Sequence, residues 1–597
     1  MRDNKGQNKN VEVSPLHEHM EIYRKIKSYS VTNDGMLTYN GESPIPLCHG
    51  SIVIKKELHK RDGTDTTEIY FVIEGVTRGG VRLPLVTVPA ADFNSLNWIT
   101  KAWGSAIVVM PKQTARQTLA AGILLSGQHC DINTVYTHTG YLDRDRHPID
   151  YLSANGALLN PDIKCDIIQG LSRYKLAGVS KTDDERVEAI KESVSFLNSH
   201  APEVTAPLFS FVYLVPILPL INSVIGDTSF LMFLLGKTQS GKSTLAALAM
   251  SHFGRFDSQT PPTTFASTHN AIGEMAFILK DSVLWVDDYH PKQNLTEAND
   301  QNKIFQSLVR MSGDHAMRRR LDSNAKLKDE RPPRCVFLVT GEDSPRIGQS
   351  GHARVFQLDV PETRKDISKI KKAAREGVLS RAMSDYIAHV IANYDELKLK
   401  IKESYDELFS RSSEVFGETR LTNQATLLCL SAYMFIDYAV NNKVFNKSKG
   451  EKLYAAIESS IVLNAQRQED KLKQEDPCTM YITAIKDLLL SGRVAVLDLD
   501  KTDNTSLVDR DGVRCIGWKD EKGYYFNANK SYNVVSDYYA DQNMMFVVNP
   551  NTLWRQLRDS KFLIPDKTKG TPQSQKSIAQ KNTRVLWFNS SLFDPQD

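Results

Sequence analysis

The segment GKTQSGKS, residues 236–243, constrains the fold of this chain more than any other part of the sequence. It matches the pattern GxxxxGK[ST], with the apolar run LMFLL (231–235) before it and LAALAMSHF (245–253) after it. An apolar strand that enters a glycine-rich loop and leaves it as a helix is typical of the phosphate-binding loop, or P-loop. The sequence therefore predicts an α/β fold built around a P-loop ATPase core.

The residue types in this loop suit phosphate chemistry. Glycines let backbone amides approach a phosphate, and the amino end of the following helix adds partial positive charge. We expect Lys242 to reach the β- and γ-phosphates of ATP, and the Ser243 hydroxyl to ligate Mg²⁺. The residues expected to bind ATP are Gly236, Lys237, Thr238, Gln239, Ser240, Gly241, Lys242, Ser243 and Thr244.

A second apolar strand, residues 283–286, ends in Asp287 and Asp288. In open α/β sheets, ligands bind at the carboxyl ends of the strands. We expect Asp287 to hold Mg²⁺ through water, and Asp288 occupies the position of the residue that polarises the attacking water. Asp287 follows Lys242 by 45 residues. That interval has room for one more strand between the P-loop and the strand that ends in Asp287. An ATPase of the class with this additional strand is therefore favoured over a small-molecule kinase.

A third apolar strand, residues 335–340, ends at Thr340. If the sheet is ordered as in AAA+ ATPases, Thr340 lies beside Asp287 and can contact the γ-phosphate or the attacking water. Arg354 follows shortly afterwards, just before an alternating strand. Arg354 is either an arginine finger that reaches the ATP of a neighbouring subunit or an ordinary surface arginine.

Residues 317–334 form a basic insertion between the second and third strands. The insertion contains seven Lys and Arg against three acidic residues, a net charge of +4 in a chain whose total is +3. A turn signal at residues 322–324 separates two arms. A hairpin here would let basic side chains follow a nucleic-acid backbone; the alternative is a solvated loop. The candidate DNA-binding residues are Arg318, Arg319, Arg320, Lys326 and Lys328.

At 597 residues the chain is too long for a single hydrophobic core. Composition and pattern changes predict a disordered tail (1–15), an N-terminal α+β domain (16–200), the ATPase core (201–365), a helical lid or connector (366–473) and a winged-helix-like domain (474–597). In the last of these, residues 551–584 carry eight Lys and Arg against two Asp. That segment favours binding of duplex DNA, with a charged loop on a protein-docking domain as the alternative.

The apolar run at residues 206–225 approaches the length of a membrane span. It contains Pro207, Pro216 and Pro219, so we interpret it as a buried, proline-broken helix and expect no membrane partner. The seven cysteines include no CxxC pair, which indicates reduced thiols and a cytoplasmic location.

Taken together, these motifs resemble the MCM-like AAA+ replicative helicases of mobile elements, which include the Cch-type helicases of staphylococcal cassette chromosomes and the Rep type of pathogenicity islands. The resemblance covers about residues 200–530. It implies a homo-hexamer in which Arg354 acts in trans and Thr340 is the first sensor. Two positions depart from the family pattern: Asp288 replaces the usual Glu, and Thr340 the commoner Asn.

The sequence thus predicts an ATP-dependent, ring-forming DNA helicase that couples ATP hydrolysis with Mg²⁺ to movement of a basic pore hairpin. The expected partners are single-stranded or forked DNA, and an origin duplex at the C-terminal domain. The alternative is an AAA+ regulatory switch that hydrolyses ATP without unwinding DNA. Fold analogy alone does not separate the two.

Overall fold

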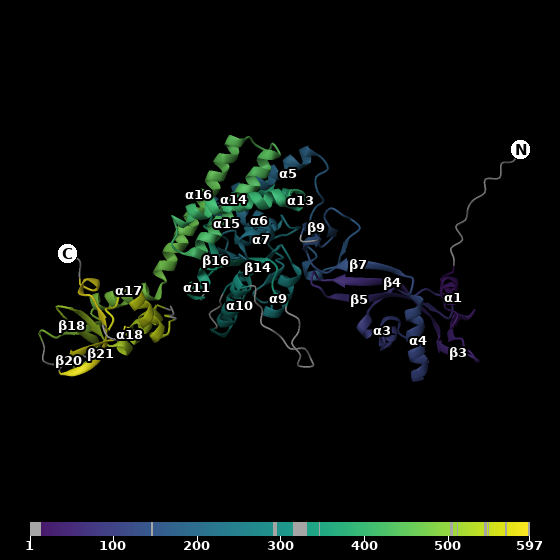
Figure 1. Cartoon of the computed structure of the whole chain (residues 1–597), viewed down its shortest axis with the longest axis horizontal. Coiled ribbons are helices and arrows are strands. Elements are labelled where there is room, and N and C mark those ends of the chain that lie inside the picture. Colours follow the sequence, from purple (N-terminus) through teal and green to yellow (C-terminus); the bar gives the residue numbers. More distant parts are fainter. Residues whose placement is uncertain are drawn as a thin grey trace.

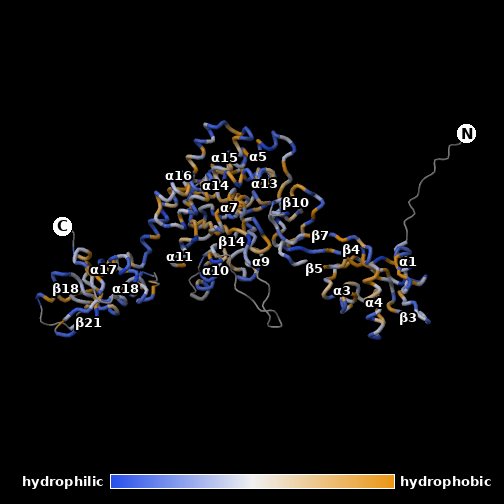
Figure 2. The backbone as a smooth tube through the Cα atoms, viewed as in Figure 1, coloured by the Kyte–Doolittle hydropathy of each residue, from blue (hydrophilic) through white to orange (hydrophobic). Residues whose placement is uncertain are grey.

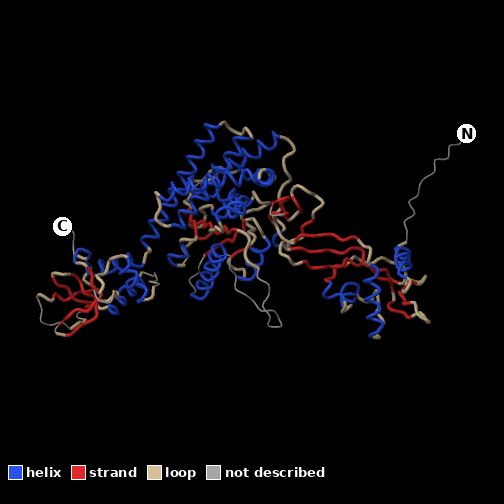
Figure 3. Tube along the Cα trace, viewed as in Figure 1, coloured by secondary structure: helices blue, strands red, loops and turns tan. Residues whose placement is uncertain are grey.

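The chain is extended, with three parts in a row (Figure 1). The computed structural model describes residues 14–144, 147–290, 295–314, 331–345, 347–363, 365–501, 506–509, 512–542, 546, 548–566, 570–578 and 580–594. Most of the predicted tail lies outside these residues, and Pro15 already begins helix α1 (Pro15–Ile26). Both end parts combine helices with strands, and helices gather over one side of the central part (Figure 3).

The central part is a mixed α/β structure built on a five-stranded sheet in which every neighbouring pair is parallel. Its strands, in the order β13-β14-β15-β12-β16, are Thr263–Thr264, Val283–Tyr289, Val336–Gly341, Leu231–Leu235 and Val355–Asp359. Near-continuous apolar runs suit such strands because helices cover both faces of a parallel sheet. Helix α8 (Lys242–Met250) follows β12, and α9 (His269–Ile278) precedes β14.

The apolar run predicted as a proline-broken helix forms α6 (Pro202–Leu214), a 3₁₀ turn and α7 (Leu218–Ile225). The break falls at Pro216 and Pro219, because proline has no N–H to donate within a helix. This stretch is long and apolar enough to cross a membrane, but 67% of its most apolar window is buried inside the protein. Figure 2 shows hydrophobic residues concentrated there, around α7.

Long helices cover α6 and α7. They are α13 (Val378–Ala392), α14 (Tyr394–Ser413), α15 (Thr419–Asn441) and α16 (Lys447–Gln474). Helix α6 packs directly against α15 and α16, so the helical segment predicted for residues 366–473 shares one core with the sheet.

The core of the central part begins at Tyr141, although the sequence assigns residues up to 200 to an N-terminal domain. Three buried tyrosines attach this segment to the centre through their hydroxyls. Tyr141 donates to Pro216 O at 2.7 Å, Tyr151 to Asp281 O at 2.7 Å and Tyr174 to Val283 O at 2.9 Å. The remaining N-terminal part is built on the long hairpin of β4 (Gly50–Arg61) and β5 (Thr67–Thr77).

The C-terminal part has its own core. Helices α17 (Pro477–Leu490), α18 (Ala528–Asp541) and α19 (Pro550–Asp559) pack on one another beside a sheet of order β17-β18-β19-β21-β20. Its strands are Val494–Asp498, Arg514–Asp520, Gly523–Phe526, Lys581–Phe588 and Ser574–Ile578.

Candidate functional site

The P-loop leaves the carboxyl end of β12 and closes tightly before α8. Gln239 and Gly241 have φ values of 66° and 92°, the left-handed conformation that lets a chain curl around a small ligand. A Cβ added to Gly236 would lie 2.6 Å from Val360 O, so only glycine fits at the start of the loop. The backbone therefore has the tight turns that a P-loop requires.

Lys242 is 8% exposed, and its ammonium lies against the loop itself. Nζ donates to Gly236 O at 2.6 Å and to Lys237 O at 2.7 Å. Burial lowers the pKa of Lys242, and the carboxylate of Glu342 opposes that shift. A partly desolvated cation beside the unpaired amides of a helix amino end is suited to bind phosphate.

Ser240 adds a further polar atom to the loop. It is 2% exposed, and within the described residues its hydroxyl oxygen has no hydrogen-bond partner. Buried hydroxyls are normally paired, so this orphaned group is consistent with a polar ligand in the loop. The loop residues thus fit a nucleotide phosphate chain.

Asp287 brings two hydroxyls together at one carboxylate oxygen. Ser243 Oγ donates to Asp287 Oδ1 at 3.1 Å, and the Thr340 hydroxyl donates to the same atom. Burial raises the pKa of Asp287, while the two hydroxyls lower it. In the described part of the chain no group of three or more His, Cys, Asp or Glu could hold a metal. A hydroxyl and a carboxylate suit Mg²⁺, which takes its remaining ligands from phosphate and water.

Asp288 lies on a β-bulge. The register between β14 and β15 shifts between Val286 and Tyr289, and Asp288 has a φ of 66°. Its N–H donates to Thr340 Oγ1 at 3.2 Å, while its side chain is exposed. Bulges are common beside active sites because they redirect a side chain.

Glu342 and His290 belong to this site although no sequence motif identifies them. Glu342 accepts from Thr238 Oγ1 at 2.8 Å and lies 3.7 Å from Lys242 Nζ. His290 Nδ1 lies 3.4 Å from the other carboxylate oxygen of Glu342. The available sequence signal is position: both residues immediately follow parallel strands, β14 and β15, at their carboxyl ends.

Arg354 does not join this cluster. Leu231 N donates to Arg354 O at 3.1 Å, at the amino end of β12, whereas the P-loop follows the carboxyl end of that strand. A five-residue strand covers about 17 Å. The guanidinium contacts Ser350, with Nη1 3.2 Å from its Oγ. The sheet thus separates Arg354 from the P-loop of its own chain.

The five candidate DNA-binding residues, Arg318, Arg319, Arg320, Lys326 and Lys328, lie outside the described residues. Helix α10 (Leu295–Asp314) ends before them. Beyond them the chain is anchored by Arg334, which donates to Phe277 O at 2.7 Å and stacks its guanidinium 3.8 Å from the Phe277 ring centroid.

The C-terminal part has a cavity of about 450 Å³ between α19 and the strands β20 and β21. Asn551, Arg555, Gln575 and Arg584 are among its lining residues. Trp554 also lines this cavity, and Trp554 and Leu557 are buried in the core. This amphipathic arrangement exposes amide and guanidinium groups, which are the types that hydrogen-bond base edges and phosphates.

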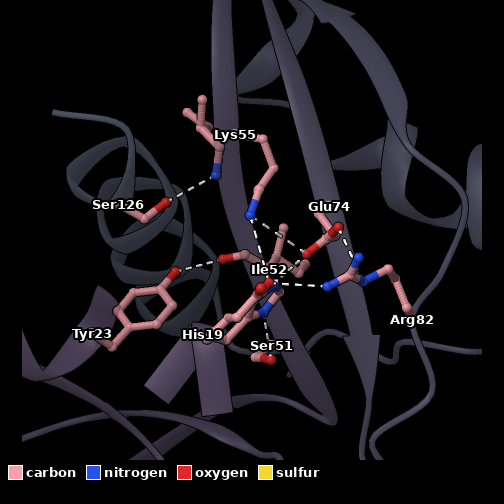
Figure 4. A network of polar contacts seen from close by, with 10 residues as sticks. His19, Tyr23, Ser51, Ile52, Lys55, Glu74, Arg82 and Ser126 are labelled. Atoms are coloured by element: carbon pink, nitrogen blue, oxygen red, sulfur yellow. Dashed lines mark hydrogen bonds and ion pairs between the residues drawn. The ribbon is translucent and has the colours of Figure 1, made fainter. Parts of the chain in front are cut away.

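A second cluster, in the N-terminal part, has the residue types of a nucleophilic triad but not its function (Figure 4). Ser51 Oγ lies 2.8 Å from His19 Nδ1, and His19 Nε2 lies 3.2 Å from Glu74 Oε1. Ser51 and His19 are 0% exposed, so no substrate reaches the hydroxyl. Burial lowers the pKa of His19 despite the neighbouring Glu74. The network ties α1 to β4 and β5.

Comparison with known proteins gives a short match and a long one. The family described as Domain of unknown function (DUF927) matches residues 192–299, which include the P-loop and Asp287. No protein with a curated description matches the sequence. A solved structure described as "SCCmec type IV Cch - active helicase" is similar with a TM-score of 0.57 and 13% identity, over 94% of this chain and 98% of that one.

Two further structures match with lower TM-scores. The C-terminal region of NrS-1 gives a TM-score of 0.29 at 11% identity, over 89% of this chain and 96% of that one. JCV Helicase gives 0.19 at 17% identity, over 41% and 73%. Neither score indicates a shared fold. The Cch structure does share the fold, which confirms, at the level of the fold, the likeness to Cch-type helicases that the sequence motifs indicate.

Proposed function

We propose that this chain is an ATP-dependent DNA helicase. The observation that carries the proposal is the meeting of Lys242, Ser243, Asp287 and Thr340 at the carboxyl edge of one parallel sheet. The likeness in fold to the Cch structure extends over nearly the whole chain and supports the same reading.

ATP is the substrate of the proposed reaction. Lys242 supplies positive charge against the β- and γ-phosphates, and the backbone from Gly236 to Thr244 surrounds them. Ser243 and Asp287 would hold Mg²⁺, which when bound neutralises charge on the phosphates. Thr340 orients Asp287 through its hydrogen bond. It would also contact the γ-phosphate or the attacking water.

The proposed architecture is an AAA+ ring, because Arg354 is remote from the P-loop of its own chain and would approach the P-loop of an adjacent subunit. The order β13-β14-β15-β12-β16 supports this assignment, because the P-loop strand lies between the strand of Thr340 and the one that follows Arg354. In a ring, an arginine on the side of the sheet away from the P-loop can serve the ATP of the adjacent subunit. The hexameric state is part of this proposal.

DNA binding is proposed at two places. The basic insertion at residues 317–334 would contact single-stranded or forked DNA in the pore. The C-terminal part would bind duplex DNA as a winged helix. Support for the winged helix comes from its three packed helices, the hairpin of β20 and β21 after α19, and the sheet order β19-β21-β20.

The test is ATPase activity with and without single-stranded DNA, together with unwinding of a forked duplex. We expect Mg²⁺-dependent hydrolysis that DNA stimulates, and strand separation that requires ATP. Hydrolysis without unwinding, and without stimulation by DNA, would instead identify a regulatory switch ATPase.

A further inference from the structure

Glu342 is the carboxylate closest to the phosphate-binding cation. It follows β15 directly, and its N–H donates to Tyr289 O at 3.0 Å, which fixes its backbone beside the end of β14. Its side chain spans the P-loop, since one carboxylate oxygen lies 2.8 Å from Thr238 Oγ1 and 3.7 Å from Lys242 Nζ. A carboxylate in this place adjoins the expected position of the γ-phosphate.

Asp288, the residue that the motif designates, is less well placed. Its backbone lies on the bulge with a positive φ, and its side chain is exposed. Among the described residues, Glu342 is the carboxylate that pairs with Lys242, at 3.7 Å from Nζ. Asp is also one methylene shorter than Glu, the residue usual at that position. Glu342 has both the length and the proximity that Asp288 lacks.

His290 supplies an orienting contact for Glu342. Its Nδ1 lies 3.4 Å from Glu342 Oε2, while Glu342 Oε1 faces Thr238. A base oriented by a third group is the usual arrangement of an activating residue. The two contacts fix the carboxylate between β14 and the P-loop.

We propose that Glu342 is the catalytic base of ATP hydrolysis, which rests on the proposed function. Glu342 accepts a proton from water as the water oxygen forms a bond to the γ-phosphorus. The bond between the γ-phosphorus and the β,γ-bridging oxygen breaks, and its electron pair stays on ADP. The proton then passes from Glu342 to the released phosphate or to solvent.

The experiment compares Glu342→Gln, Glu342→Asp and Asp288→Asn in the full chain. The matched control is Asp343→Asn, because Asp343 is the adjacent, exposed carboxylate and lies 3.8 Å from His290 Nδ1. We measure kcat for ATP hydrolysis and affinity for a fluorescent ATP analogue. Loss of a general base lowers rates by about 10²–10⁴-fold, so we expect that loss in Glu342→Gln with affinity for the analogue unchanged or higher. Asp343→Asn should match the wild type.

A kcat of Glu342→Gln within threefold of the wild type overturns the proposal, as does a loss fully explained by weaker binding of the analogue. In the first case, a higher affinity would show that Glu342 only competes with phosphate for Lys242. If Glu342→Gln does not fold, Glu342→Asp decides: a kcat at least about tenfold lower supports the proposal, and an unchanged kcat overturns it. A wild-type chain that binds ATP without hydrolysing it contradicts the proposed function instead.

Discussion

Ser243 Oγ donates a hydrogen bond to Asp287 Oδ1 at 3.1 Å, which joins the first turn of α8 to the carboxyl end of β14. The pair links the two halves of the proposed ATP site, 44 residues apart in sequence. Both groups are oxygen donors of the kind that Mg²⁺ prefers, directly or through water.

Asp287→Asn should lower Mg²⁺-dependent ATP hydrolysis by about 10–100-fold, the range for a residue that holds a metal through a second shell. The amide keeps the side chain's size but removes its charge. The apparent Mg²⁺ affinity, from ATPase rates over a magnesium titration, checks this. The exposed Asp300 on α10 provides the control Asp300→Asn, which should leave the titration unchanged. An unchanged magnesium dependence in Asp287→Asn would show that Asp287 does not hold the metal.

Lys242→Ala should lower ATP hydrolysis by about 10²–10³-fold, the effect of removing one preorganised charge-stabilising group. The fold should remain, because among the described residues the ammonium bonds to the loop and pairs with Glu342. Steady-state ATPase assays and far-UV circular dichroism check both statements. Lys303→Ala, at an exposed lysine on α10, is the charge-matched control. Hydrolysis at the wild-type rate by folded Lys242→Ala would contradict the ATP site itself.

The sequence predicts the central sheet well because its strands are long apolar runs that end in motifs. Strands β12, β14 and β15, and the loop between Gly236 and Ser243, need only local signals. The segment from Tyr141 to Leu176 is different, because it joins the central core through separate tyrosines and short strands. Such contacts depend on tertiary packing, which no local periodicity reports.

The candidate site also contains residues that local sequence patterns identify and residues whose place depends on tertiary packing. Lys242, Ser243 and Asp287 belong to patterns with fixed spacing, and the structure brings them together with Thr340. Glu342 has no pattern of its own. Its place depends on the pairing of β14 with β15, and that neighbour relation follows from strand order rather than from sequence order.

Arg354→Ala should leave ATP binding intact and lower hydrolysis by about 10³–10⁵-fold if the residue acts as a finger in trans. Mixing two inactive variants tests whether Arg354 acts on the ATP of a neighbouring subunit. Inactive Arg354→Ala and inactive Lys242→Ala chains should partly restore hydrolysis together, because some mixed interfaces combine an intact P-loop with an intact arginine. Mixed assemblies that never hydrolyse ATP would contradict the trans assignment.

Acid should destabilise the fold through two buried histidines. Burial lowers the pKa of both His138 and His252 to about 4, below the ordinary 6.5. The unfolded chain therefore binds more protons between pH 6.5 and 4, so stability is full above pH 6.5 and falls as the pH drops. Each histidine contributes about 1.4 kcal/mol per pH unit in that window.

His252 gives the sharper measurement, because both ring nitrogens have buried partners. Its Nδ1 donates to Ala249 O at 3.0 Å, and its Nε2 lies 2.9 Å from Ser193 Oγ. His252→Gln keeps polar atoms but does not titrate, so thermal unfolding followed from pH 7 to pH 4.5 should show a shallower loss of stability. The exposed His129 provides the control His129→Gln, which should keep the wild-type slope. If the stability of His252→Gln depends on pH as steeply as that of the wild type, His252 does not have the lowered pKa.

Replacing Arg318, Arg319 and Arg320 together with Ala separates a helicase from a regulatory switch. In an extended arm neighbouring side chains alternate in direction, so we expect two of the three to face DNA. Each phosphate contact with single-stranded DNA contributes about 0.7 to the slope of log affinity against log salt, so the slope should fall by about 1.4 per engaged subunit. Basal ATP hydrolysis should survive, while stimulation by DNA and unwinding of a fork are lost together. A triple variant with wild-type unwinding and an unchanged salt slope would favour the switch.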